Sequence, residues 1–292
     1  MKRNSPTERP TSWWLDVLRR REAKMHDEYI TRDELRWSST AEQQAAVRFF
    51  NAAFRAEESG LTQAHQLAHT VAEWDPDLAE VLRLYGNEEG WHRELLTAFL
   101  EQIGGSVAPM GRVTRTFYRL YGRAERMETI VLTNLMFETI GATTYRLALR
   151  NVAQGPARRM LTILTRDESF HVPLNVHFLR QVLRRSSPEA HRRLRLLYRL
   201  LFVSLTLLPL ASRPKARAFD RIGTLELSRA YAEQLAQLFA REHDLDFPPP
   251  RWLLLLLGLS PKRLANNGDV AVTSVEAAER AAERDAVQVT PL

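Results

Sequence analysis

The chain has 292 residues, a net charge of +6 and no cysteine. The lack of cysteine excludes disulfides, thiolate nucleophiles and cysteine-ligated zinc or iron–sulfur sites, so a metal would have to be held by His, Asp and Glu. Apolar residues make up 45% of the chain and charged residues 26%, which is typical of globular proteins. No apolar run approaches about 18 residues and the first ten residues lack an apolar signal core, so we expect a cytoplasmic protein.

Helical periodicity dominates the sequence and no alternating, strand-like run appears, so we predict an all-α fold. The predicted helices span about residues 12–29, 39–72, 78–103, 123–152, 157–185, 191–208, 224–243 and 252–259. Pro173 should kink its helix without ending it, because the helical pattern resumes after it. Pro209 should end the helix that it follows, and a basic break is expected at residues 213–217.

Four of the predicted helices are much longer than the average globular helix of about 11–12 residues, which favours a four-helix bundle. We expect an N-terminal helical segment, the bundle, a C-terminal helical extension packed on it and a disordered polar tail. These domains correspond to residues 1–36, 37–187, 188–262 and 263–292.

Two predicted bundle helices carry the same acidic-Glu-x-x-His motif, Glu88 to His92 and Asp167 to His171. With 24 Glu and 8 His in the chain, roughly 0.7 Glu-x-x-His matches are expected by chance, and about 0.1 with the preceding acid. Residues three apart share one face of a helix, so each Glu–His pair could bind one metal ion. Both pairs, Glu89 with His92 and Glu168 with His171, lie on apolar stripes, where an uncompensated carboxylate would be costly.

The other two bundle helices offer one further carboxylate each. Glu138 is the only acid on its apolar stripe. The earlier helix offers Glu57 or Glu58, and Glu57 is preferred because it falls on the stripe of Phe50 and Phe54. Glu168 follows Glu89 by 79 positions and Glu138 follows Glu57 by 81, so the chain resembles a duplicated helical hairpin.

One Glu from each of two helices plus Glu-x-x-His from each of the other two is the ligand pattern of ferritin-like di-iron carboxylate proteins. The sequence resembles that superfamily over about residues 40–185. In motif form it is most similar to the acyl-(acyl carrier protein) desaturases, whose first-helix ligand begins a Glu-Glu-x-x-x-Thr stretch like the one from Glu57 to Thr62. Gly141 stands where those desaturases carry a Thr implicated in proton handling, with Thr139 and Thr143 nearby.

The resemblance implies a ferritin-like bundle with two iron ions as cofactors. It assigns bridging roles to Glu89 and Glu168, terminal roles to Glu57 and Glu138, and one ion each to His92 and His171. A ligand set without thiolates also suits manganese, so a manganese–iron pair stays open. Glu88 and Asp167 are either acceptors for ligand-histidine N–H groups or solvated helix charges. A substrate would lie beside Gly60, Gly141 or Ala142.

We therefore expect a dioxygen-dependent di-iron oxidase, oxygenase or desaturase that acts on an organic substrate and needs an electron donor. An acyl chain on an acidic carrier protein would suit the arginine cluster, which comprises Arg180, Arg184, Arg185 and Arg192. The arginines follow no nucleic-acid-binding motif, so no nucleic-acid partner is expected. Two alternatives stay open, a ferroxidase or iron-handling protein and a metal-free helical interaction protein. A homodimer is one oligomeric state that the sequence allows.

Overall fold

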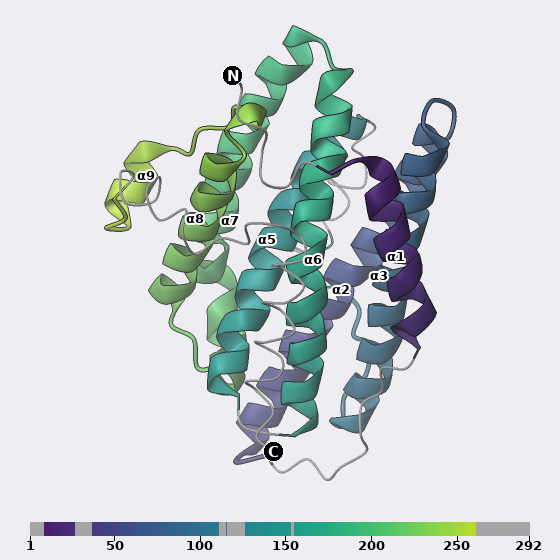
Figure 1. The fold of residues 1–292 in the computed structure, drawn as a ribbon. Coiled ribbons are helices and arrows are strands. Elements are labelled where there is room, and N and C mark those ends of the chain that lie inside the picture. Colours follow the sequence, from purple (N-terminus) through teal and green to yellow (C-terminus); the bar gives the residue numbers. More distant parts are fainter. Residues whose placement is uncertain (1–8, 27–36, 111–114, 116–125, 153–154, 261–292) are drawn as a thin grey trace. The chain divides into compact units, whose positions relative to one another are not determined.

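The structure is a computed structural model that describes residues 9–26, 37–110, 115, 126–152 and 155–260. Within these residues every regular element is a helix and no strand is present, which confirms the all-α prediction (Figure 1). None of the described helices combines the length and hydropathy needed to cross a bilayer. The predicted disordered tail, residues 263–292, lies outside the described residues, as do residues 27–29 and 123–125 at the ends of two predicted helices.

The helices belong to two compact units. The N-terminal unit comprises Arg9–Met127 and Val152–Met160, and it contains α1, α2 and α3. Of the described residues, the C-terminal unit comprises Glu128–Asn151 and 161–260, and it contains α5, most of α6 and all later helices. The four predicted domain ranges were inferred from sequence composition. They stay predictions, because the division into two units does not test them.

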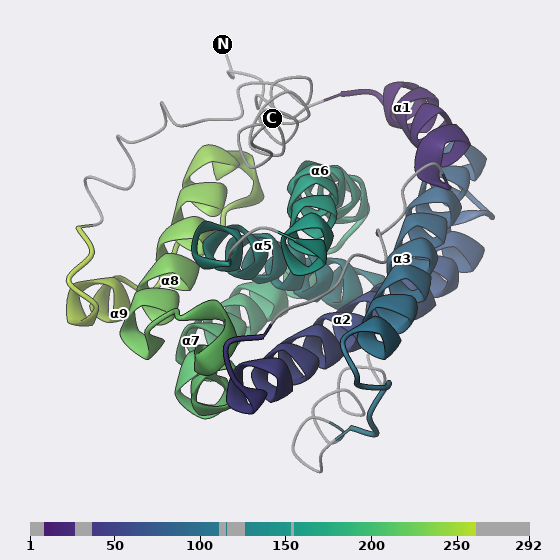
Figure 2. The same ribbon diagram turned by 90° about the horizontal axis from the view of Figure 1, so that it is seen from below.

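The N-terminal unit consists of α1 (Thr11–Met25), α2 (Thr40–Val71) and α3 (Pro76–Gln102), of which α3 packs against both α1 and α2 (Figures 1 and 2). Local capping defines where the two long helices begin. The side chain of Ser39 accepts a hydrogen bond from the Glu42 N–H at the start of α2, and Asp75 accepts one from the Leu78 N–H at the start of α3. Both helices begin and end within two residues of the predicted positions.

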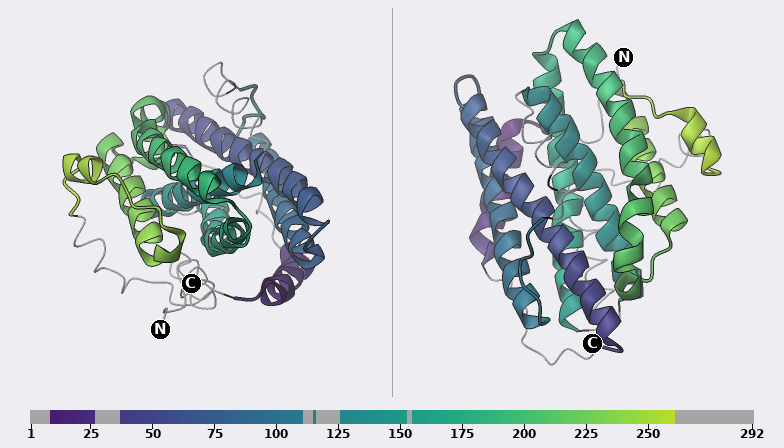
Figure 3. Two further views of the ribbon diagram at one scale, coloured as in Figure 1. Left: turned by 90° about the horizontal axis from the view of Figure 1, so that it is seen from above. Right: turned by 180° about the vertical axis from the view of Figure 1, so that it is seen from behind.

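The C-terminal unit consists of α5 (Met127–Asn151), α6 (Pro156–Arg184), α7 (Pro188–Asp220), α8 (Thr224–Arg241), the short 3₁₀-helix η1 (His243–Leu245) and α9 (Arg251–Leu256). α7 and α8 lie side by side (Figure 2). The hydroxyls of Thr144 in α5 and Tyr231 in α8 are 2.6 Å apart. Arg229 of α8 donates to the Leu257 carbonyl at the end of α9, which appears in yellow-green in Figure 3. These bonds tie the later helices to α5.

Proline affects α6 and α7 less than local propensity suggests. Pro173 lies inside α6, as predicted. The prediction that Pro209 ends a helix is wrong, because α7 continues to Asp220, and residues 213–217 are helical and form no break. An interior proline costs about 3 kcal/mol, but the longer helix brings Phe219 into the core, and tertiary packing supplies most helical stability. The helix ends at Asp220, and the residue after it, Arg221, has a left-handed φ of 56°.

Candidate metal centre

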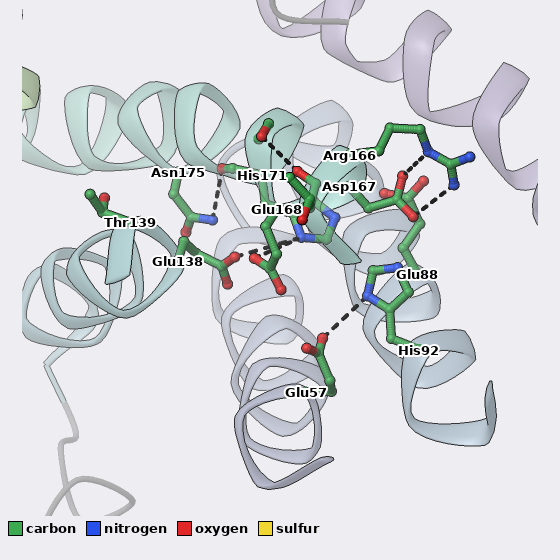
Figure 4. A network of polar contacts seen from close by, with 12 residues as sticks. Glu57, Glu88, His92, Glu138, Thr139, Arg166, Asp167, Glu168, His171 and Asn175 are labelled. Carbon is green, nitrogen blue, oxygen red and sulfur yellow. Dashed lines mark hydrogen bonds and ion pairs between the residues drawn. The ribbon is translucent and has the colours of Figure 1, made fainter. Parts of the chain in front are cut away.

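Glu57 of α2 and His92 of α3 meet inside the N-terminal unit. Glu57 is 1% exposed and His92 is 2% exposed, and His92 Nδ1 lies 3.2 Å from Glu57 Oε2 (Figure 4). The helical period places Glu57 on the stripe that also buries Phe50 and Phe54, and this stripe is the part of α2 that faces the core. Both predicted ligands therefore point into the α2–α3 hairpin.

Glu89 joins these two residues through its contact with Gly60. It lies one turn before His92 on α3, and a Cβ atom at position 60 would come within 2.8 Å of Glu89 Oε2. Gly60 is one turn after Glu57 on α2, so the carboxylate of Glu89 reaches α2 next to Glu57. The space that the sequence offered to a substrate beside Gly60 is thus taken by Glu89. We refer to Glu57, Glu89 and His92 as the α2–α3 half-site.

The C-terminal unit contains the corresponding cluster on α5 and α6. His171 is fully buried, and its Nδ1 lies 3.6 Å from Glu138 Oε2 and 3.7 Å from Glu168 Oε2 (Figure 4). Both carboxylates are buried as well. Asn175 lies one turn further along α6, where its side chain donates to the His171 carbonyl. We refer to Glu138, Glu168 and His171 as the α5–α6 half-site.

The donor set of the two half-sites suits a hard or borderline cation. Each half-site contributes two carboxylates, one imidazole and no sulfur, a set of ligands that suits iron or manganese. Buried carboxylates are costly unless they are paired or bind a cation, and all four here are buried. All six residues belong to groups of buried Glu and His side chains that could hold a metal ion. The residues present therefore fit the predicted metals.

The structure shows which of the two adjacent glutamates, Glu57 or Glu58, faces the interior. Glu58 is partly exposed and pairs with Arg55 at 2.5 Å. Successive residues on a helix point about 100° apart, so only one of the two acids can face the hairpin interior. Glu57 occupies that interior position.

The acids that precede the motif glutamates are both paired with arginine. Glu88 accepts a hydrogen bond from Arg21 of α1 at 2.7 Å. Asp167 accepts two from Arg166, at 2.7 and 2.9 Å (Figure 4). Neither acid is a solvated helix charge, because both are buried. Their arginine partners offset part of the negative charge that the half-sites place in the interior.

Two threonines near Glu138 are held by their own helix. The Thr139 hydroxyl donates to the Leu135 carbonyl and the Thr143 hydroxyl donates to the Thr139 carbonyl, both at 2.7 Å. Gly141 is different from Gly60, because a Cβ atom there would meet only Tyr145, at 3.9 Å. Position 141 thus has room for a Cβ atom.

Asn175 is a site residue that the sequence prediction did not single out. Its side chain is 1% exposed and donates to the backbone carbonyl of His171, a predicted ligand. The available signal was its place four residues after His171 on the inward stripe, where an amide interrupts an apolar pattern.

The predicted arginine cluster needs one correction. Arg180 is 4% exposed and donates to Glu242 and Asp244 near η1, at 2.7 Å in each case, so it is not part of a docking surface. Arg184, Arg185 and Arg192 are exposed. The arginine spacing alone could not show this, because the acids that pair with Arg180 lie more than 60 residues away.

Comparisons of this chain with family models, with curated proteins and with solved structures found no match. The resemblance to ferritin-like di-iron proteins therefore rests on the motifs and on the helices that carry them.

Proposed function

We propose that this protein is a non-haem di-iron oxidoreductase that uses dioxygen to oxidise an organic substrate. The observation that supports this most is that each unit buries a helix glutamate together with a Glu-x-x-His motif from its partner helix. A surface coincidence would not produce two clusters of the same composition in the interior. The burial cost of four carboxylates is readily explained if they bind cations.

Glu57, Glu89 and His92 would hold one iron ion, and Glu138, Glu168 and His171 would hold the other. The same ligand types hold the two irons of ferritin-like di-iron proteins. Bound iron would supply the redox chemistry that activates dioxygen. The chain holds the ligands in place, and its buried surroundings limit the access of water. Part of the substrate would lie beside Gly141, where a Cβ atom would make only an ordinary contact with Tyr145.

The arginine pairs act on the ligands indirectly. Arg21 with Glu88 and Arg166 with Asp167 fix charged groups next to the motif glutamates. Such surrounding groups commonly orient metal ligands and change metal affinity by about 10–100-fold. They give the chain a means of tuning its metals that does not depend on the substrate.

Metal analysis tests the proposal. The protein is expressed in iron-replete medium and bound metals are counted per chain, with Glu89→Ala plus Glu168→Ala as the test variant. The matched control is Glu58→Ala plus Glu94→Ala, which changes two glutamates of α2 and α3 that do not face the interior. We expect about two iron ions per chain in the wild type and control, and loss of iron in the test variant with its helical circular dichroism retained.

A folded wild type without bound metal would contradict the proposal and favour the metal-free interaction protein. Uptake of many ferrous ions per chain during oxygen consumption would favour the iron-handling protein. Oxygen consumption by the loaded, reduced protein that stops after one turnover is the result expected of an enzyme that lacks its organic substrate.

A further inference from the structure

The large, strongly exposed apolar side chains of the described residues all lie in α7, α8 and α9. Five are leucines of α7 with exposed fractions between 41% and 63%, namely Leu196, Leu200, Leu207, Leu208 and Leu210. The described parts of α1 to α6 have none. Contiguous apolar exposure of this kind marks an interaction site, whereas isolated exposed leucines do not.

Four of these leucines form one stripe along α7. Leu196, Leu200, Leu207 and Leu210 are spaced by four, seven and three residues, which keeps them on one face of the helix. The stripe is about 21 Å long at 1.5 Å per residue. Leu208 lies about a third of a turn away from its centre, so the exposed apolar face is wider than the narrow seam of a two-stranded coiled coil.

Arginines border the stripe on both sides. Arg193 and Arg199 precede and follow Leu196 by three residues, so they flank it on opposite edges, and both are exposed. Arg199 makes no hydrogen bond or ion pair with any of the described residues. The neighbouring Arg192 and Arg195 are paired with Glu189 and Asp246 respectively. Arg193 interacts electrostatically with Glu189, so Arg199 supplies the positive charge at the edge of the apolar stripe that no described residue pairs.

We propose that α7 docks on an anionic membrane surface. The leucine stripe would enter the boundary between headgroups and acyl chains, while Arg193 and Arg199 bind lipid phosphates at its edges. A lipid surface is flat enough for the wide leucine face and presents phosphates along both edges at once. A second copy of the chain fits less well, because its α7 would set the same arginines against these arginines.

Vesicle flotation with the full-length, metal-loaded protein tests this. The probes are vesicles of phosphatidylcholine alone and of phosphatidylcholine mixed with phosphatidylglycerol. We expect binding to the anionic vesicles only, weakened by added salt because the attraction of exposed charges is screened. Leu200→Glu plus Leu207→Glu, and separately Arg193→Glu plus Arg199→Glu, should each weaken the binding about tenfold or more.

Two controls match these variants in size and charge. Leu255→Glu plus Leu256→Glu changes two exposed leucines of α9, and Arg48→Glu plus Arg150→Glu changes two exposed arginines of α2 and α5. Both should bind like the wild type. The proposal is overturned if the wild type does not float, if both vesicle types bind it equally, or if the controls lose as much binding as the α7 variants. A wild type that ignores vesicles would direct the search to an acidic helix of a partner protein, and dimers dispersed by the Leu200 variant would identify a second copy as the occupant.

Discussion

Glu89 of α3 and Gly60 of α2 are in contact so close that a Cβ atom at position 60 would lie 2.8 Å from the carboxylate oxygen Oε2. A side chain at position 60 would therefore have to displace the Glu89 carboxylate. The constraint at position 60 is the space that this carboxylate occupies and not backbone freedom, because position 60 is ordinary α-helix.

The Gly60→Ala variant should bind iron less tightly than the wild type. The added methyl group must displace the Glu89 carboxylate, and displaced ligand surroundings lower metal affinity by about 10–100-fold. Gly141→Ala is the matched control, since its Cβ would meet only Tyr145 at an ordinary contact distance. Competition with a chelator measures both affinities. Equal affinity in the two variants would show that Glu89 is not held by this contact when metal is bound.

Glu57 and Glu58 should differ sharply when each is changed to glutamine. Glu57→Gln removes a buried carboxylate next to His92 and should abolish or greatly reduce iron binding. Glu58→Gln removes only a partly exposed ion pair with Arg55, and such pairs contribute about 0–1 kcal/mol. Metal content and thermal melting of the two variants measure the difference. Iron loss in the Glu58 variant alone would show that the first-helix ligand has been misassigned.

Arg180 should be important for stability, although it belongs to no metal half-site. Arg180→Ala would leave Glu242, which is 2% exposed, without its guanidinium partner. Loss of one member of a buried ion pair costs about 3–5 kcal/mol. Arg192→Ala, which breaks an exposed pair with Glu189, should cost about 1 kcal/mol or less. Chemical denaturation compares the two, and similar losses would mean that Glu242 finds another partner.

His177 should make the protein sensitive to mild acid. Burial, together with the charges of Arg180 and Arg184, lowers the pKa of His177 from 6.5 to about 3. Below pH 6.5 the unfolded chain binds a proton at this residue and the folded chain does not, so stability falls as the pH drops from 6.5 toward 3. The loss is about 1.4 kcal/mol per pH unit.

The His177→Leu variant should lack this contribution. Urea titrations measure the free energy of unfolding at pH 6.5 and at pH 5. Between these two pH values it should decrease by about 2 kcal/mol less in the variant than in the wild type. The comparison is between slopes, so a packing change that shifts both values equally does not affect it. An unchanged slope would mean that His177 is protonated in the folded state at pH 5.

The sequence by itself determined where the helices lie and which residues are candidate ligands. The 3.6-residue period of apolar residues located α2, α3, α5 and α6 to within a few residues, apart from the start of α5, where residues 123–125 are not described. The same period placed each motif glutamate and its histidine on the inward stripe, because both are local properties of one helix. The paired motifs were informative because a repeated spacing does not depend on how the chain folds.

Only the tertiary structure decided which contacts these residues make. It buries Glu57 and leaves Glu58 partly exposed. The Glu89 carboxylate fills the space beside Gly60, and Arg180 is buried in ion pairs and does not lie on the predicted docking surface. The tertiary structure also carried α7 through Pro209, where the local rule predicted an end. Each of these outcomes depends on a partner distant in the chain, whose packing energy is comparable to the local preference it overrides.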